Sequence, residues 1–211
     1  MIRILVVDDH ELVRVGLRFV LSEYESLCLV GEAGDGETAI RMARQLKPHV
    51  VLLDISLPGL SGFEVTTRLK KAHPELGIII LTVHEAAPYP GKMLNAGASG
   101  YLTKGCPATE LVEAIREVAD GGRHIGSRVA QAMALNLMQG TDISPFDGLS
   151  AREMEVLLML VDGLKIADIA GVMHLSPKTV ATYKYRIFEK LDTRNDVDMT
   201  LMAVRHGVVA A

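Results

Sequence analysis

Residues 50–62 read VVLLDISLPGLSG, and this stretch decides the fold that the sequence predicts. Four apolar residues are short enough for a buried strand, an aspartate ends them, and proline and glycine turn the chain. The same arrangement recurs over the first 120 residues, where apolar bursts alternate with amphipathic stretches. Such alternation indicates a parallel sheet with crossover helices.

The bursts and stretches predict five strands and five helices in a doubly wound α/β domain over residues 1–120, the flavodoxin-like class. The expected strands are Ile2 to Val7, Leu27 to Gly31, Val50 to Leu53, Ile78 to Leu81 and Gly100 to Leu102. The expected helices cover about residues 10–23, 36–46, 61–72, 88–96 and 107–119. Sheets of this kind hold their chemistry at the carboxyl ends of the strands.

Beyond residue 120 the sequence predicts helices only. Residues 121–148 read as a helical linker, with a helix from Ser127 to Met138 and a polar stretch from Gln139 to Gly148. Residues 149–211 are expected to form a small all-α domain, whose helices cover about residues 150–162, 166–173, 176–191 and 196–206.

Two start signals support this second domain. Ser150 with Glu153 has the form of a capping box. Ser176 and Pro177 supply an N-cap and a first-turn proline for the longest helix, and Gly207 is expected to stop the last one.

The composition excludes several classes of protein. Of the 211 residues 49% are hydrophobic and 23% charged, which argues for packed cores and against disorder. No apolar run approaches the roughly 20 residues of a membrane helix, and two acids interrupt the start MIRILVVDD where a signal peptide would continue. The net charge of -4 argues against a coat on nucleic acid. We therefore expect a cytoplasmic protein with no membrane partner.

Five polar residues follow the predicted strands. Asp8 and Asp9 end the first strand and Asp54 the third, so the three carboxylates meet at one edge of the sheet. Their mutual repulsion makes sense with a hard divalent cation, and Mg2+ suits such a site because it leaves positions for water and phosphate oxygens. Thr82 and Lys104 end two further strands and add a hydroxyl and an ammonium. The set predicts a carboxylate nucleophile for a phosphoryl group.

Aspartates also favour strand ends for purely structural reasons, and the second strand contributes nothing to the pocket. A dispersed set that ends four strands is nevertheless hard to obtain by chance. His10 and His84 border the pocket, but Mg2+ prefers oxygen ligands, so we interpret His10 as a helix-start residue and His84 as a loop residue. Cys28 and Cys106 lack metal-ligand spacing, and the apolar run around Cys28 favours a reduced core residue.

The second domain contains a predicted helix-turn-helix, from Ile166 to Met173 and from Ser176 to Leu191. On its longer helix Val180, Ile187 and Leu191 are expected to face the core. A second face carries groups suited to base edges and thymine methyls, and cations flank it for phosphate contacts. The first set is Lys178, Ala181, Thr182 and Tyr185, and the second is Lys184, Arg186 and Lys190. A plain helical bundle with a solvated charged face is the alternative.

Residues 1–120 resemble a response-regulator receiver, on VVDDH at 6–10, LLDISLPGLSG at 52–62, LTVH at 81–84 and GYLTK at 100–104. The resemblance implies that Asp54 accepts a phosphoryl group from a phosphohistidine of a sensor histidine kinase. It implies that Asp9, Asp54 and the backbone carbonyl of Ser56 bind Mg2+, and that Asp8 acts largely through water. It also implies that Thr82 and Lys104 hold the phosphoryl oxygens, with Tyr101 as an aromatic switch.

The stretch GLSAREMEVLLMLVDGLKIADIAGVMHLSPKTVATYKYRIFEKL at 148–191 resembles the LuxR-type DNA-binding domain, and the domain order is similar to NarL/FixJ-type regulators. The motifs LTVH, SPKTV and AVRHG resemble the GacA/UvrY type in particular. That resemblance implies a hybrid sensor kinase as partner and promoters of small regulatory RNAs as targets. RNA polymerase is a further candidate partner.

Residues 149–211 carry equal numbers of basic and acidic residues, so monomers are expected to bind DNA weakly. We therefore expect a homodimer on an inverted repeat of double-stranded DNA. An apolar stripe on the last helix, Val197, Leu201, Val204 and Val208, is expected to cover the core in part and to supply a dimer face with the rest.

Two other functions compete with this one. A Mg2+-dependent phosphohydrolase would use Asp54 as nucleophile, but it gives the helix-turn-helix no role, and the sequence places no second acid to activate water. A transcription factor with a degenerate receiver would lack part of the pocket, whereas this chain has the full set. We expect no enzyme beyond phospho-acceptance and slow self-dephosphorylation.

Overall fold

The computed structural model describes residues 1–83, 89–138, 145–173, 175–206 and 208. It divides into two compact units, the first made of Met1–Glu85 and Met93–Gln131 and the second of the remaining residues. We call them the amino-terminal and carboxy-terminal units. None of the helices in the described ranges combines the length and the apolar character of a membrane span.

The amino-terminal unit contains a parallel sheet in the order β2-β1-β3-β4-β5-β6. Its strands are β1 (Ile2–Val7), β2 (Leu27–Ala33), β3 (Val50–Leu53), β4 (Gly77–Thr82), β5 (Gly100–Thr103) and β6 (His124–Ile125). The first five confirm the predicted doubly wound fold. The sixth was not predicted, because a two-residue strand leaves no periodic signal.

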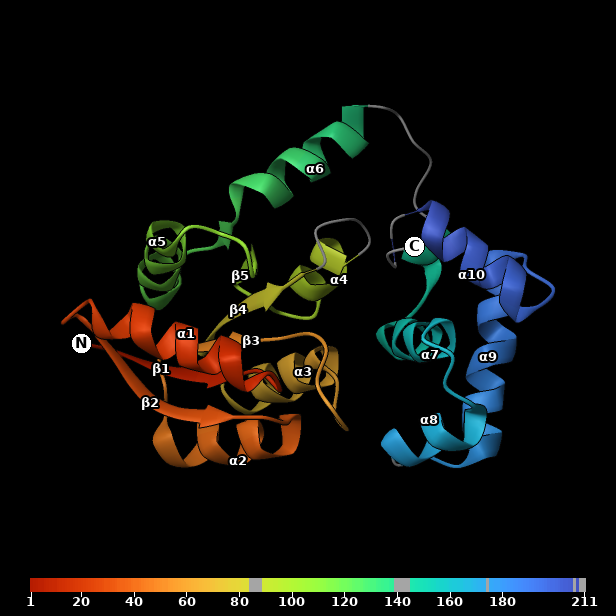
Figure 1. Ribbon diagram of the computed structural model, residues 1–211, viewed down its shortest axis with the longest axis horizontal. Coiled ribbons are helices and arrows are strands. Elements are labelled where there is room, and N and C mark those ends of the chain that lie inside the picture. The colour runs from red at the N-terminus through yellow and green to blue at the C-terminus, as the bar shows by residue number, and fades with distance from the viewer. Residues whose placement is uncertain (84–88, 139–144, 174, 207, 209–211) are drawn as a thin grey trace. The chain divides into compact units, whose positions relative to one another are not determined.

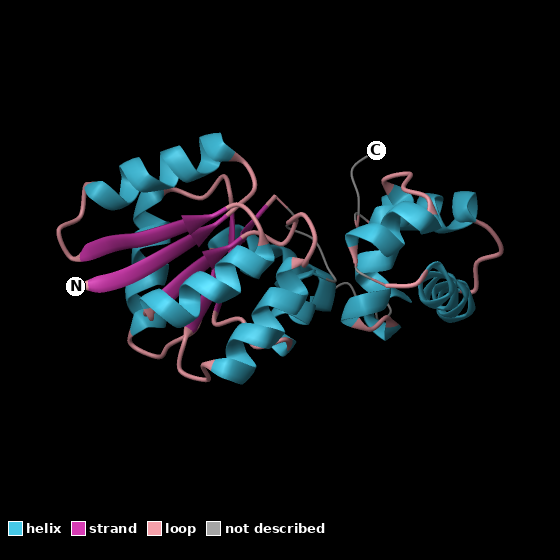
Figure 2. Ribbon diagram, turned by 90° about the horizontal axis from the view of Figure 1, so that it is seen from below, coloured by secondary structure: helices cyan, strands magenta, loops and turns pink. Residues whose placement is uncertain are grey.

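Helices cover both faces of the sheet (Figure 2). The helices that lie wholly in this unit are α1 (Glu11–Ser22), α2 (Gly36–Leu46), α3 (Gly62–Ala72) and α5 (Ala108–Ala119). Two further helices, α4 (Tyr89–Asn95) and α6 (Ser127–Met138), have residues in both units. In Figure 1 α1 and α5 lie on one side of the strands and α2 and α3 on the other. Burial on both faces explains why β1, β3 and β4 are nearly continuous apolar runs.

Side-chain caps fix where two of these helices begin. The Asp35 carboxylate accepts a hydrogen bond from the Thr38 N–H at the start of α2, and the Ser61 hydroxyl accepts one from the Glu64 N–H at the start of α3. Each cap satisfies a backbone donor that has no partner within its helix. The α3 cap follows directly after the loop that carries Asp54, so it also fixes where that loop ends.

The carboxy-terminal unit contains α7 (Ala151–Val161), α8 (Ile166–Val172), α9 (Pro177–Leu191) and α10 (Asp196–Arg205), preceded by the 3-10 helix η1 (Pro145–Gly148). The predicted capping box of Ser150 and Glu153 is confirmed, as are the N-cap Ser176 and the first-turn proline of α9. Gly163 ends the α7 turn with a φ of 84°. Gly207 lies outside the described residues.

The polar stretch predicted from Gln139 to Gly148 is only partly described, because residues 139–144 lie outside the described ranges. Its last four residues form η1, where Phe146 is fully buried and its ring contacts that of His206 at 5.7 Å between centroids. This end of the predicted linker therefore belongs to the core of the carboxy-terminal unit.

Candidate functional site

Strand pairing brings the three aspartates of the predicted pocket together. Val7 and Leu53 lie opposite each other in β1 and β3, and the Asp54 N–H donates to the Val7 carbonyl over 2.9 Å. Asp8 and Asp54 therefore leave neighbouring strands at the same level, and both are buried, with exposures of 2% and 3%. Asp9 is exposed.

Lys104 supplies the cation that contacts two of these carboxylates. Its Nζ lies 2.6 Å from Asp54 Oδ2 and 2.8 Å from Asp8 Oδ2. The backbone N–H of Lys104 donates to the Thr82 carbonyl over 2.8 Å, and this bond joins the end of β5 to the end of β4. The Lys104 side chain therefore reaches Asp54 as predicted. The Thr82 side chain is fully buried at the end of β4, and its contact with phosphoryl oxygens stays a prediction.

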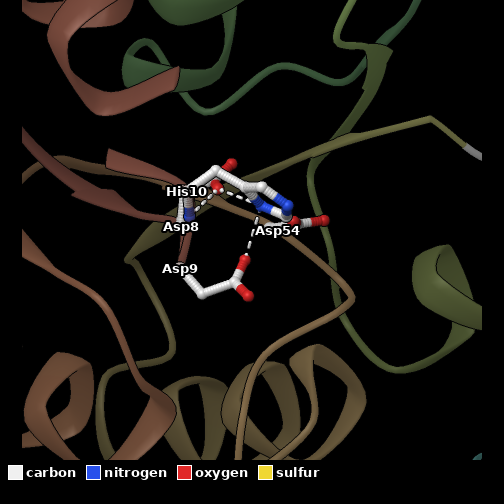
Figure 3. Close-up of side chains that lie close together, drawn as sticks. All are labelled: Asp8, Asp9, His10 and Asp54. Atoms are coloured by element: carbon white, nitrogen blue, oxygen red, sulfur yellow. Dashed lines mark hydrogen bonds and ion pairs between the residues drawn. The ribbon is translucent and has the colours of Figure 1, made fainter. Parts of the chain in front are cut away.

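His10 is exposed and contacts the two acids at the end of β1. Its Nδ1 lies 2.7 Å from Asp9 Oδ1 and 3.2 Å from Asp8 Oδ1, as the dashed lines in Figure 3 mark. The backbone N–H of His10 also donates to Asp8 Oδ1 over 2.8 Å. His10 is the N-cap position of α1, as predicted, and its ring in addition contacts the acids. His84 lies outside the described residues.

The charges in the pocket are unbalanced. Burial raises the pKa of Asp54, the Lys104 hydrogen bond and charge oppose that shift, and the Asp8 charge adds to it. For Lys104 burial acts to lower the pKa, but the bonds to Asp54 and Asp8 outweigh it, so the pKa is raised and the ammonium stays charged. Three carboxylates around one ammonium leave net negative charge.

This donor set fits a divalent cation. One ligand atom each from Asp8, Asp9, His10 and Asp54 lies within 4.8 Å of the others. Three of the four are carboxylates, the hard oxygen donors that Mg2+ prefers. A cation there would lower the energy of the buried Asp8 and Asp54 carboxylates, whose negative charge Lys104 alone does not balance.

The structure also locates the remaining predicted pocket residues. The Ser56 N–H donates to Asp54 Oδ1 over 3.3 Å, so this residue borders the carboxylate. Metal binding by its carbonyl stays a prediction. Tyr101 lies in β5 opposite Ile80 and is fully buried, and its switch role likewise stays a prediction.

Arg14 is a pocket neighbour that the sequence did not reveal. Its Nη1 donates to the Asp8 carbonyl over 2.7 Å, and its Nε lies 3.6 Å from Glu32 Oε2. The Arg14 side chain therefore lies between the end of β1 and Glu32 of β2. Its position one helical turn after His10 is the signal from which it was predictable.

The predicted reading face of α9 is exposed as a whole. Val180, Ile187 and Leu191 are buried, as predicted. On the opposite side Lys178, Ala181, Thr182 and Tyr185 are all exposed, and Tyr185 shows 69% of its surface. A 15-residue helix with an exposed, uninterrupted face that begins only a few residues after a short helix is typical of a helix-turn-helix.

The flanking cations differ in their surroundings. Lys184 Nζ lies 2.7 Å from Asp196 Oδ2 and 5.4 Å from the Phe188 ring centroid. Lys190 Nζ lies 2.6 Å from Oε2 of the buried Glu153. Arg186 is exposed. Contacts of all three with phosphates stay predictions, and the structure gives Lys190 a role inside the domain.

Two protein families match this chain, one over the acidic pocket and one over the helix-turn-helix. Residues 4–116 match the model of the response regulator receiver domain. Residues 147–203 match the model of bacterial regulatory proteins of the luxR family. The two matched segments contain the pocket and the helix-turn-helix respectively.

Similar proteins share this domain order over their whole length. The response regulator GacA of Pseudomonas protegens is 49% identical over 100% of this chain and 99% of its own. UvrY of Escherichia coli is 45% identical over 100% and 97%. RcsB of Salmonella enterica serovar Typhimurium, solved on promoter DNA with a phosphomimetic, is 26% identical over 95% and 97%, with a TM-score of 0.76. The chain therefore belongs to the response regulators that join a receiver to a LuxR-type DNA-binding domain and control transcription.

Proposed function

We propose that Asp54 accepts a phosphoryl group from a phosphohistidine of a sensor histidine kinase and that phosphorylation increases binding to DNA. The observation that carries this proposal is the position of Asp54, whose buried carboxylate lies within reach of Lys104 and of two further acids. A buried nucleophile between a fixed cation and a cation site is what transfer of a phosphoryl group requires.

In the transfer an Asp54 oxygen forms the new P–O bond as the P–N bond to the donor imidazole breaks, and the imidazole retains the electron pair. Asp8, Asp9, Asp54 and the backbone carbonyl of Ser56 would hold Mg2+, which would neutralise negative charge on the phosphoryl oxygens. Lys104 and Thr82 hold oxygens of the product. Slow hydrolysis of this aspartyl phosphate is the only turnover we propose.

The docking surface for the donor protein must border this pocket. Helix α1 begins directly after His10 and exposes an apolar stripe, with Leu12, Val15 and Phe19 at 82%, 44% and 68%. A cavity of ≈ 340 Å³, lined by residues of α1, α5 and Lys104, adjoins that stripe. Exposed apolar groups at helical spacing fit the apolar face of a partner helix. We assign this surface to the helical domain that carries the phosphohistidine.

DNA binding is assigned to the exposed face of α9, in a homodimer on an inverted repeat. The RcsB structures include one described as two dimers on two parallel DNAs. Of the predicted apolar stripe, Val197 and Leu201 on α10 are exposed at 66% and 49%, Val204 is half-buried and Val208, beyond the end of α10, is buried. We assign Val197 and Leu201 to the dimer face, and we place the protein in the cytoplasm with its DNA.

The test begins with a duplex chosen from a random library by the phosphorylated full-length protein, here called the selected duplex. Acetyl phosphate and Mg2+ should raise the affinity of the wild type for this duplex by about tenfold or more. Asp54→Ala should show no increase. A wild type whose affinity does not respond, or an Asp54→Ala variant that responds equally, would contradict the proposal.

A further inference from the structure

The sixth strand joins the linker to the strand that carries the predicted switch. β6 pairs in parallel with β5, and Ile125 lies opposite Tyr101. The His124 N–H donates to the Ser99 carbonyl over 3.0 Å, and the Gly126 N–H donates to the Tyr101 carbonyl over 2.8 Å. The linker is therefore hydrogen-bonded to the backbone of Tyr101 itself.

Side chains of α5 hold the start of α6 against the same edge. Glu110 Oε1 accepts hydrogen bonds from the Ser127 N–H and hydroxyl over 2.8 and 2.9 Å. These bonds act as a cap for the first turn of α6, which contains no acidic residue of its own. Glu117 Oε2 lies 2.8 Å from His124 Nδ1, and Val129 in that first turn is fully buried.

At its other edge β5 pairs with β4, and the residue that follows β5, Lys104, reaches the acidic pocket. Thr103 pairs with Thr82 of β4, and Lys104 contacts Asp54. A phosphoryl group on Asp54 places new oxygens before the Lys104 ammonium and the Thr82 hydroxyl. The Lys104 ammonium already lies 2.6 Å from Asp54 and 2.8 Å from Asp8, so these oxygens must displace it. We infer that this displacement moves the carboxyl end of β5.

We propose that phosphorylation of Asp54 weakens the β5–β6 pairing and releases linker residues 124–131 from the amino-terminal unit. The inference rests on the proposed function, since it takes Asp54 as the phosphoacceptor. β6 is only two residues long, so a small displacement of β5 is enough to weaken this pairing. Release gives the carboxy-terminal unit the freedom to meet a second copy on one duplex.

Gly126 offers a matched pair of variants. Proline removes the N–H that bonds Tyr101, and it prefers an extended preceding residue, which Ile125 in β6 already is. Alanine keeps the N–H, and its Cβ would lie 3.0 Å from Leu102 Cδ2, the end of a flexible side chain. Gly126→Pro therefore tests the hydrogen bond, and Gly126→Ala controls for the added carbon.

The experiment uses full-length protein and the selected duplex. In the wild type, hydrogen–deuterium exchange at the His124 amide should rise by about threefold or more after acetyl phosphate and Mg2+. Without phosphorylation Gly126→Pro should show the same faster exchange and bind the duplex about three- to tenfold more tightly than the wild type. Gly126→Ala should stay within about twofold of the wild type.

Several outcomes would overturn the inference and leave the proposed function intact. One is a wild type that binds DNA more tightly on phosphorylation with unchanged exchange at His124. Another is a Gly126→Pro variant that stays protected, or that exchanges faster yet binds like the wild type. Glu110→Gln, which weakens the cap without changing the backbone, repeats the comparison should Gly126→Pro not fold. A wild type that takes up no phosphoryl group contradicts the proposed function instead.

Discussion

At the scale of single residues, two of the ion pairs with a buried carboxylate have different roles. Asp54 with Lys104 lies in the acidic pocket, and Glu153 with Lys190 lies in the helical domain. Each carboxylate is nearly fully buried, at 3% exposure, so each depends on its cation to stay charged. Around the first pair the carboxylates outnumber the ammonium, so a divalent cation can bind there. The second pair joins α7 to α9 and is structural.

Glu153 should make stability depend on pH. Burial acts to raise its pKa, but hydrogen bonds from Lys190 and Ser150 together lower the pKa below the ordinary value of 4.5. A lowered pKa stabilises the fold above that ordinary value, and the contribution is lost as pH falls through the folded pKa. Glu153→Gln should reduce the free energy of unfolding by about 1–3 kcal/mol at pH 7.

Chemical denaturation of the full-length protein, followed by circular dichroism, measures this difference. Glu189→Gln, on an exposed position of α9, is the matched control and should change stability little. The gap between Glu153→Gln and the wild type should shrink below pH 4.5. A gap that stays constant with pH would show that Glu153 does not stabilise the fold through its charge.

At the scale of single elements, α9 separates two kinds of DNA contact. Tyr185 lies on the exposed reading face, and the exposed Arg186 lies beside it. Tyr185→Ala should lose about 1–3 kcal/mol of preference for the selected duplex over a scrambled one and keep most nonspecific binding. Arg186→Ala should weaken both duplexes alike and lower the salt slope by about one unit.

Titrations of both duplexes over a range of salt concentrations distinguish these contacts. Glu189→Gln again serves as control, because Glu189 is also an exposed residue of α9. If Tyr185→Ala retains the full preference for the selected duplex, sequence is read by another surface.

Local sequence patterns predicted some elements of this fold and missed others. Five strands, the caps at Ser150 and Ser176 and the buried face of α9 were predictable, because each depends on local spacing. The acidic pocket was predictable for the same reason, since its residues follow strand ends. β6 was not, because its pairing with β5 depends on an edge that only the folded sheet presents. The Glu153–Lys190 contact was also missed, because it joins residues 37 positions apart.

At the scale of the whole molecule, we propose that the amino-terminal unit inhibits DNA binding by the carboxy-terminal unit until Asp54 is phosphorylated. The stretch between α6 and η1 contains Gly140, Thr141, Asp142 and Ser144, a composition typical of a linker. Control is then a shift between two states, and a few kcal/mol are enough to change DNA occupancy by orders of magnitude.

Removal of the receiver should therefore relieve the inhibition. We expect residues 145–211 alone to bind the selected duplex more tightly than unphosphorylated full-length protein, by about tenfold. Parallel titrations of the two proteins on one duplex measure this, with the phosphorylated full-length protein as reference. A fragment that binds no better would contradict autoinhibition and favour control through dimerisation of the receiver.

Intact-mass measurement of the full-length protein tests phospho-acceptance by Asp54 most directly. With acetyl phosphate and Mg2+ the wild type should gain one phosphoryl mass, and excess chelator should abolish the gain, because the acids cannot approach a phosphoryl dianion without a cation. Asp54→Ala should gain none, while its circular dichroism spectrum stays that of the wild type. An Asp54→Ala variant that still gains one phosphoryl mass on another aspartate, or full labelling in chelator, would contradict the assignment.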